Sequence, residues 1–376
     1  MKKSTKICHI SIGHNPDDDR IYYKELRSLA KIYRDVHFIA PDRKSPPSDG
    51  IIKFHLFPFS KNVLRNAISA LRIATSVKAD IYHIHEFEFL PFALVLKLKY
   101  RRKVIYDAHE SVFYYFPDFS RKPRFFTLPV GAISQLLEWF CIMFVDFVIT
   151  VTPWIKKDLQ RFNKKISIIY NYPIKEFFRT IHSSKRKNKT VLYHGQLSHA
   201  RNIESIIKAF PHVIKRIPDA ELKIVGYGPE HYVKKLKELI KCNNLEEYVK
   251  IFPPIDYKEI PSLISEATIG LSSMFPNKSF MRSIQVKIFE FMASGIPVLG
   301  CNTPANRYYI EKHSTGFVID PPTPENIARH IIKLLLNPGL VVTLGKNGVE
   351  AVEKKFNWNL MEKRLFKIYK LVEEKC

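Results

Sequence analysis

The chain alternates short β-rich segments with longer amphipathic segments, and this alternation restarts near its middle. In the first half, buried strands are predicted at residues 7–12, 36–39, 81–84, 104–106, 147–151 and 166–170, with helices at 21–31, 62–77 and 90–98. Successive strands separated by helices run parallel, with the helices packed on both faces of the sheet. The first half therefore predicts a doubly wound α/β domain.

The second half repeats this architecture without repeating the sequence. Strands are predicted at 191–193, 222–225, 249–252, 269–271, 297–299 and 316–318, and the chain ends in helices near 341–355 and 359–374. Between the halves, residues 182–189 are polar and basic and hold no core residue, which is typical of a linker. We therefore expect two domains, 1–178 and 190–356, joined by a linker at 179–189.

The composition fits two globular domains and is strongly basic. The chain has 376 residues, 46% of them apolar, and its net charge is +24. Residues 1–175 hold 29 Lys and Arg against 16 Asp and Glu, so the first half contributes +13 of the net charge of +24. A basic surface attracts the phosphates of nucleic acid, anionic lipid or an anionic substrate, or it only keeps the protein in solution.

Cysteines and apolar runs bear on the location of the protein. Five cysteines are scattered without a C-x-x-C pair, which argues against a disulfide framework or zinc cluster and favours a reducing compartment. No signal peptide is recognisable. The most membrane-like stretch, 125–151, is interrupted by Glu138 and Asp146, so a spanning helix is not expected. We expect a soluble or peripheral cytoplasmic protein.

Open α/β sheets bind ligands at the carboxyl ends of their strands, so the turns after the strands are candidate sites. In the second half, Gly195 follows one strand, while Gly226 and Gly228 follow another; glycine lets a ligand approach the backbone closely. Arg201 precedes a helix start and suits a phosphate. The alternative is an ordinary strand-to-helix turn with a solvated arginine.

Lys287 and Glu290 form the second candidate in this half. They are three residues apart and so share one face of a predicted helix that ends at Gly295. Such a pair can hold a nucleotide, with the lysine on the diphosphate and the glutamate on the ribose hydroxyls. The alternative is a weak salt bridge on the protein surface.

In the first half, histidines and carboxylates follow three strands of one sheet. His14 follows the first strand, residues 83–88 cover the end of the third, and Asp107, His109 and Glu110 follow the fourth. Such groups can orient sugar hydroxyls and relay protons. The alternative for each histidine is a structural role. The aspartates at 17–19 point in different directions along one run, so no metal site is predicted.

These residues resemble those of glycosyltransferase family 4, the glycosyltransferase group 1 domain. The resemblance spans essentially the whole chain, and the segment Lys287-Ile-Phe-Glu-Phe-Met-Ala-Ser-Gly-Ile-Pro-Val298 is its most specific part. Other matching segments are Tyr193-His-Gly-Gln-Leu-Ser with Arg201, Leu222-Lys-Ile-Val-Gly-Tyr-Gly-Pro229, Asp17–Arg20 with Lys24 and Glu25, Asp80-Ile-Tyr-His-Ile-His-Glu86, Ile105-Tyr-Asp-Ala-His-Glu110 and Phe356-Asn-Trp358.

The resemblance implies the GT-B fold, in which two Rossmann-like domains face a central cleft and a last helix, about 357–376, crosses back to the first domain. It implies an acceptor in the first domain and a nucleotide-sugar donor in the second. Arg201 and Lys287 would contact the diphosphate and Glu290 the ribose. His109 would lie near the transferred sugar, beside Gly13 and His14.

Two departures from the family pattern are visible. Many members have two glutamates eight residues apart, of which the second corresponds to Glu290, and here Arg282 stands at the first position. The missing glutamate usually contacts hydroxyls of the donor sugar. Asn202 stands where a glycine is common after the basic residue.

The resemblance predicts a retaining hexosyltransferase that moves a sugar from a UDP- or GDP-linked donor to a hydroxyl acceptor without a metal or other cofactor. Cations and helix N-termini would stabilise the leaving diphosphate. The basic first half fits a lipid-linked or cell-surface glycan acceptor at the anionic inner face of the cell membrane. Alternatives are an epimerase or phosphorylase of similar fold, or a basic binding protein. No nucleic-acid partner is expected, since no recognised motif is present.

Overall fold

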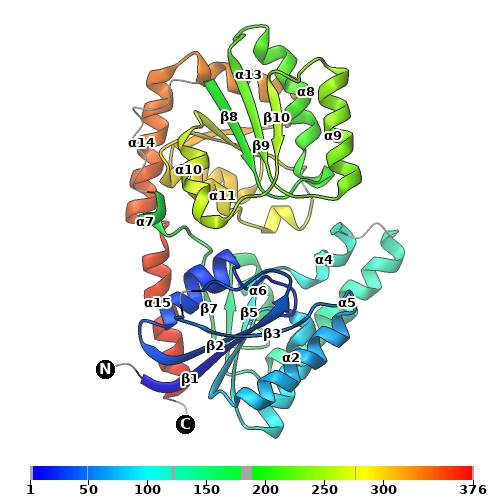
Figure 1. The fold of residues 1–376 in the computed structure, drawn as a ribbon, viewed down its shortest axis with the longest axis vertical. Coiled ribbons are helices and arrows are strands. Elements are labelled where there is room, and N and C mark those ends of the chain that lie inside the picture. The colour runs from blue at the N-terminus through cyan, green and yellow to red at the C-terminus, as the bar shows by residue number, and fades with distance from the viewer. Residues whose placement is uncertain (1–2, 49, 120–122, 179–188, 276, 375–376) are drawn as a thin grey trace. The chain divides into compact units, whose positions relative to one another are not determined.

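The computed structural model describes residues 3–48, 50–119, 123–178, 189–275 and 277–374. It forms two compact units, Met1–Asn171 with Asn359–Cys376, and Tyr172–Trp358 (Figure 1). The first unit thus ends seven residues before the predicted boundary at 178. Of the predicted linker, 179–188 lies outside the described residues, and Lys189 already begins a strand.

The first unit contains a seven-stranded, wholly parallel sheet with the order β3-β2-β1-β4-β5-β6-β7. Its strands are β1 (Lys3–Ile10), β2 (Tyr33–Asp42), β3 (Lys53–Pro58), β4 (Ile81–Ile84), β5 (Lys103–Ala108), β6 (Phe147–Thr150) and β7 (Ile166–Ile168). Sequence analysis missed β3, an edge strand whose exposed and half-buried positions carry Lys53 and His55 and so give no clear apolar run.

Helices flank this sheet, and the last one comes from the far end of the chain. They are η1 (Asp19–Leu26) continuing into α1 (Arg27–Leu29), α2 (Val63–Val77), η2 (Phe87–Phe89), α3 (Leu90–Leu94) continuing into η3 (Val95–Lys99), α4 (Val112–Phe119), α5 (Arg124–Ile142), α6 (Pro153–Leu159) and α15 (Trp358–Glu373). The predicted return of the last helix is confirmed, because Tyr369 of α15 is fully buried and its hydroxyl contacts His9 of β1.

The second unit contains a six-stranded parallel sheet with the order β10-β9-β8-β11-β12-β13, the same winding as in the first unit. Its strands are β8 (Lys189–His194), β9 (Ala220–Val225), β10 (Val249–Phe252), β11 (Ile269–Ser272), β12 (Val298–Cys301) and β13 (Gly316–Ile319). Its helices are α7 (Lys175–Phe178), η5 (His199–Arg201), α8 (Ile203–Ile214), α9 (Glu230–Cys242), η6 (Tyr257–Glu259), α10 (Ile260–Ser265), η7 (Phe280–Arg282), α11 (Val286–Ala293), α12 (Pro304–Asn306), η8 (Arg307–Glu311), α13 (Pro324–Leu335) and α14 (Pro338–Lys354).

Helix α5 carries polar side chains on its buried side, followed by the buried Cys141 and Ile142 at its end. Gln135 and Glu138 are almost completely buried, and Glu138 accepts hydrogen bonds from the Tyr106 hydroxyl at 2.8 Å and from the Gln135 amide at 2.5 Å. By length and composition Phe125–Ile142 could cross a membrane, and a third of it is buried against the unit. Glu138 therefore does not interrupt an apolar surface; it anchors the inner side of the helix.

The buried Glu138 makes stability depend on pH. Burial raises its pKa from an ordinary 4.5 to about 7, against the hydrogen bonds from Tyr106 and Gln135. Between these values the folded chain holds a proton that the unfolded chain has released, so stability falls as pH rises. Gln cannot ionise, so the free energy of unfolding of Glu138→Gln does not carry this loss. Its difference from wild type should therefore be up to about 3 kcal/mol more favourable at pH 8 than at pH 4.

Thermal unfolding across this pH range checks the expectation. Glu246→Gln, at an exposed position, serves as the control and leaves the pH profile as in wild type. An equal effect of Glu138→Gln at both pH values would contradict the assignment.

Candidate functional site

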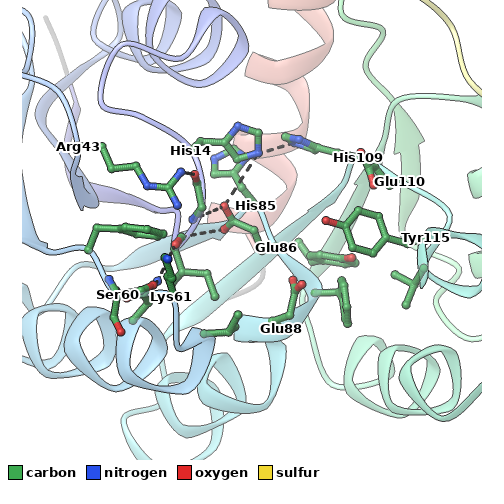
Figure 2. Close-up of a pocket in the computed structure, with 18 residues that line it drawn as sticks. His14, Arg43, Ser60, Lys61, His85, Glu86, Glu88, His109, Glu110 and Tyr115 are labelled. Atoms are coloured by element: carbon green, nitrogen blue, oxygen red, sulfur yellow. Dashed lines mark hydrogen bonds and ion pairs between the residues drawn. The ribbon is translucent and has the colours of Figure 1, made fainter. Parts of the chain in front are cut away.

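The carboxyl ends of β1, β4 and β5 are neighbours in the first sheet, so the loops that follow them meet. They surround a pocket of about 460 Å³ within the first unit (Figure 2). Three of the four residues predicted as catalytic, His14, His109 and Glu110, line it. Other polar lining residues are Arg43, Ser60, Lys61, Asn66, His85, Glu86, Glu88, Tyr106 and Tyr115.

Glu86 fixes the loop after β1. Its carboxylate accepts hydrogen bonds from the backbone N–H of Ile12 at 3.1 Å and of Gly13 at 3.0 Å, and from the Ser11 hydroxyl at 2.5 Å. Because Glu86 follows β4, this contact ties two neighbouring strand ends together and sets the position of His14.

His14 is held as a cation. Its Nδ1 lies 2.8 Å from the Asp18 carboxylate. Burial opposes its protonation, but the charge and hydrogen bond of Asp18, with a contribution from Glu86, outweigh burial and raise the pKa of His14 to about 10. The pocket therefore has a fixed positive group at this edge at neutral pH. The three aspartates of the 17–19 run go to separate partners, Lys44, His14 and Lys24.

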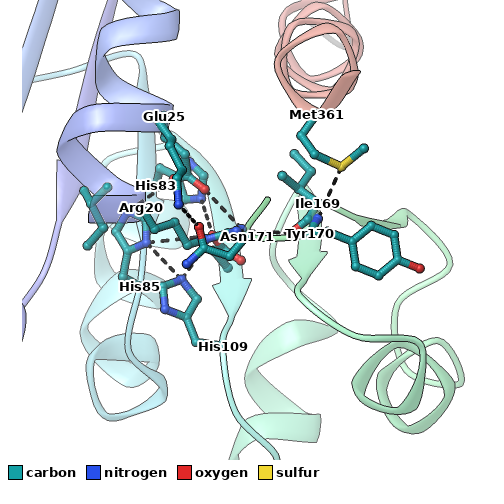
Figure 3. A network of polar contacts seen from close by, with 12 residues as sticks. Arg20, Glu25, His83, His85, His109, Ile169, Tyr170, Asn171 and Met361 are labelled. Atoms are coloured by element: carbon teal, nitrogen blue, oxygen red, sulfur yellow. Dashed lines mark hydrogen bonds and ion pairs between the residues drawn. The ribbon is translucent and has the colours of Figure 1, made fainter. Parts of the chain in front are cut away.

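Asp107, the fourth predicted residue, is fully buried and does not line the pocket. Figure 3 shows Arg20, Glu25 and His109 in the polar network that it belongs to. Its Oδ2 accepts from His109 Nε2 at 3.1 Å and from Arg20 at 2.7 and 3.0 Å. Burial alone would raise the pKa of Asp107, but Arg20 and His109 outweigh it and hold the pKa well below its usual range. Asp107 is therefore an ionised group that positions His109.

A directed chain of hydrogen bonds follows from this charge. An ionised carboxylate only accepts, so His109 Nε2 carries the proton, and His85 Nδ1, 3.4 Å away, is left as an acceptor. Then His85 Nε2 donates to His9 Nδ1 at 2.9 Å, and His9 Nε2 donates to the Tyr369 hydroxyl at 2.9 Å. Tyr369 in turn donates to His83 Nδ1 at 2.9 Å.

Glu25 is the remaining carboxyl of the network, and its neutral form leaves the charge of Asp107 to be balanced by Arg20. Burial raises its pKa well above the usual range, and Asp107 raises it further by charge and by a hydrogen bond, against the attraction of Arg20. A neutral Glu25 can then donate its proton toward Asp107, whose Oδ1 has no other hydrogen-bond partner among the described residues. Arg20 lies 3.1 Å from Glu25 and donates also to the Ile169 carbonyl.

The same residues include groupings of metal-ligand type. Atoms of His9, Glu25, His83 and His85 lie within 4.8 Å of one another. The Arg20 guanidinium beside Glu25 repels a cation there, and nitrogens of His9 and His85 already bond to each other. The donors are therefore of the right kind for a metal, but charge and hydrogen bonding favour the network described above.

Sequence analysis did not single out His9 or Tyr369. His9 lies inside a strand, and Tyr369 is 286 residues from His83 and 360 residues from His9, so no spacing signal links them. Glu88 lines the pocket, and burial, followed by the charges of Glu86 and Glu110, raises its pKa to about 7. The sequence did place Glu88 in the polar run that ends β4.

In the second unit, the predicted glycines meet one another. A Cβ on Gly226 would lie 1.8 Å from the Gly195 carbonyl oxygen, and one on Gly228 would lie 2.3 Å from the Leu197 carbonyl oxygen. Gly195 has a φ of +119°. The turns after β8 and β9 therefore pack backbone against backbone, which only glycine permits.

Lys287 points at the same turn. Its Nζ would lie 3.1 Å from a Cβ on Gly195 and stands 3.9 Å from the centre of the Tyr193 ring. Burial, and then the nearby charge of Arg201, lower the pKa of Lys287 well below its usual range, while Glu290 opposes the shift. The structure thus brings Gly195, Arg201 and Lys287 into one cationic site.

Glu290 lies on the same helix, α11, and is buried. Its Oε2 is 3.3 Å from His194 Nε2, and burial, followed by the charge of Lys287, lowers the pKa of His194 to about 3, so this histidine is neutral. With Glu290 buried and Lys287 half-buried, an exposed salt bridge does not describe the pair.

The two departures from the family pattern have structural counterparts. Asn202 adopts a left-handed conformation with φ +55°, which glycine favours and asparagine tolerates, and its amide donates to the Ser273 hydroxyl and the Pro322 carbonyl. Arg282 ends η7 and lies outside α11.

Comparison with known proteins gives two family matches that together cover most of the chain. Residues 21–172 match Glycosyltransferase Family 4, and residues 174–351 match Glycosyl transferases group 1. The chain belongs to glycosyltransferase family 4.

Relatives and structures agree with this family. Spore coat protein SA of Bacillus subtilis is 27% identical over 189 residues, 48% of each chain, so the chain spans about half the length of this relative. A GDP-mannose-dependent alpha-(1-6)-phosphatidylinositol monomannoside mannosyltransferase of Mycobacterium tuberculosis is 23% identical over 47% of this chain and 46% of its own. HepE of Anabaena, solved with UDP and glucose, has the same fold, with a TM-score of 0.76 at 17% identity over 97% and 99% of the two chains.

The glycine contact in this family 4 chain gives a test of the second-unit site. Gly226→Ala drives a Cβ into the Gly195 carbonyl and should lower the free energy of unfolding by about 1–3 kcal/mol. Gly339→Ala makes the same change in α14 where nothing lies within 4 Å, and should stabilise by up to about 1 kcal/mol. Urea unfolding measures both. Equal effects of the two substitutions would show that the turns do not pack as described.

Proposed function

We propose that the chain is a retaining glycosyltransferase that transfers a hexose from a UDP- or GDP-linked donor to a hydroxyl of a lipid-linked or cell-surface glycan precursor. The observation that carries the proposal is the cationic site of the second unit, where Lys287 and Arg201 meet the close-packed glycine turns. A half-buried lysine beside an arginine lacks a full negative counter-charge, and a diphosphate supplies it.

The donor lies on this site in the proposal. The turns at Gly195 and Gly226 let the diphosphate approach the backbone, and Lys287 and Arg201 neutralise it. The buried Glu290 accepts hydrogen bonds from the ribose hydroxyls. HepE, solved with UDP and glucose, and the GDP-mannose-dependent mannosyltransferase support a nucleotide sugar without choosing the base.

No metal or other cofactor is part of the proposal. As the sugar leaves, negative charge develops on the nucleoside diphosphate, and Arg201 together with Lys287, protonated when the diphosphate binds, stabilises that charge. The negative charge of the departing group stabilises the protonated form of Lys287, which burial otherwise disfavours.

The acceptor lies in the pocket of the first unit. His109, held by Asp107 in one tautomer, and the cationic His14 position the acceptor hydroxyl and the transferred sugar. Glu88, with a pKa near 7, can take up or release a proton there. A pocket of this size with several charged lining residues favours transfer over epimerisation, which requires no acceptor site. We place the reaction in the cytoplasm, at the inner face of the cell membrane.

A thermal-shift screen against UDP, GDP and their sugars tests the proposal. One nucleotide should raise Tm, because a ligand that binds only the folded chain stabilises it. Lys287→Ala and Glu290→Ala should each abolish that rise. The matched control is Lys346→Ala, which removes an exposed lysine of α14 and should leave the rise unchanged. A full rise in both site variants would place the donor elsewhere.

Proton uptake gives an independent check. Lys287 has a lowered pKa in the free chain, and a bound diphosphate favours its charged form, so the pKa rises on binding. Between the two values nucleotide binding takes up a proton, and affinity falls as pH rises. Calorimetry in buffers of different ionisation enthalpy should show this uptake, and Lys287→Met should remove it. Binding without proton exchange in wild type would count against Lys287 as the phosphate ligand.

A further inference from the structure

Helix α5 exposes the side that a surface helix normally buries. The side chains of Phe125, Ile133 and Leu136 are 69%, 66% and 60% exposed, whereas Gln135 and Glu138 face inward. Helices on soluble domains carry the opposite arrangement, with apolar residues toward the core. Among the described α5 side chains the outward face carries no charge, so the unit presents a long apolar ridge.

The polar inner side fixes this orientation. Glu138 is hydrogen-bonded to Tyr106 of β5, and the Trp139 ring stacks on Phe162 with centroids 4.6 Å apart. The Asn163 amide caps the end of the helix by donating to the carbonyls of Ile142 and Val145. Rotating the ridge inward would break each of these contacts, so the ridge is a built feature of the fold.

Cations surround the C-terminal end of the ridge. Lys97 binds the Asp146 carboxylate just after α5 at 2.7 Å, which brings the following turn, with exposed Leu98, Lys99 and Tyr100, beside this end. Asn163, which also contacts this end, is flanked in sequence by the exposed Arg161 and Lys164. The nearby Asp146 is neutralised by its ion pair. Apolar side chains edged by lysine, arginine and tyrosine are typical of segments that lie in the membrane interface.

We infer that α5 is a membrane-docking helix whose apolar ridge enters the headgroup region of an anionic bilayer while the Lys99–Arg101 turn and Arg161–Lys164 contact its phosphates. The bonds of Glu138, which lie on the opposite side, hold the helix on the protein surface, so it docks without spanning. A second copy fits less well, because a symmetric pair would bring two basic edges of like charge together.

Docking also bears on the acceptor, a consequence that rests on the proposed function. Helix α4 packs against α5, and its residues Val112 and Tyr115 line the first-unit pocket. A bilayer bound to the ridge therefore contacts the same helical hairpin that forms a wall of the acceptor pocket. An acceptor carried by a membrane lipid then needs only its sugar or phosphate portion to leave the headgroup region.

Vesicle flotation with the full chain tests the inference. Wild type should float with vesicles of phosphatidylcholine and phosphatidylglycerol, and at least about ten-fold less with phosphatidylcholine alone or at high salt. The double variant Ile133→Glu with Leu136→Glu should lose binding at least about ten-fold. The matched control, Val342→Glu with Leu371→Glu, changes exposed apolar residues away from α5 and should float as wild type does. Circular dichroism confirms that each variant is folded.

Each other outcome overturns the inference. Wild type that stays unbound, or a ridge variant that binds fully, excludes α5 as the docking helix. Equal binding to neutral vesicles excludes the charged edge. If wild type does not bind vesicles and sediments as a dimer, while the ridge variant sediments as a monomer, the ridge is the contact with a second copy. Nucleotide-induced Tm shifts, measured without vesicles, separate this test from the proposed function, since the ridge variant keeps a donor shift that Lys287→Ala lacks.

Discussion

The ionised Asp107, buried against Arg20, is the interaction on which the first-unit site depends. A buried carboxylate needs compensation, and Arg20, His109 and a neutral Glu25 together provide it. Because that charge accepts only, it fixes the proton on His109 and sets the direction of the hydrogen bonds through His85 and His9. The series of hydrogen bonds passes through Tyr369 of α15 to His83, so the last helix is tied into the site by the same charge. Tertiary closure of the first unit and the tautomer of its central histidine thus share one cause.

The second unit solves a complementary problem. There the uncompensated charge is positive, on Lys287, and the pKa of that lysine is lowered by burial and by Arg201. One unit holds a satisfied anion and an ordered pocket, while the other holds cations that lack a full counter-charge. This asymmetry fits a division of labour in which one unit orients a neutral hydroxyl and the other receives a diphosphate.

Much of this was predictable, for identifiable reasons. Strand ends of a parallel sheet gather at one edge, so His14, His109 and Glu110 were predicted to meet once the alternation was recognised, and they line one pocket. Helical spacing predicted that Lys287 and Glu290 share a face. The edge strand β3 was missed because its half-buried pattern lacks an apolar run, and the first unit ends before the predicted boundary. The inner anchor of α5 was missed because Glu138 counted as a charge in an apolar stretch.

The sequence by itself determined the doubly wound parallel sheets, the strand ends that carry polar side chains, and the family to which the chain belongs, because these depend on local periodicity and on short contiguous motifs. The tertiary structure alone decided how each buried charge is compensated. Arg20 compensates Asp107, burial raises the pKa of Glu138 beside Tyr106 to about 7, and Lys287 lacks a full counter-charge among the described side chains near it. These outcomes depend on burial and on contacts between distant segments. No local pattern encodes the desolvation that sets them.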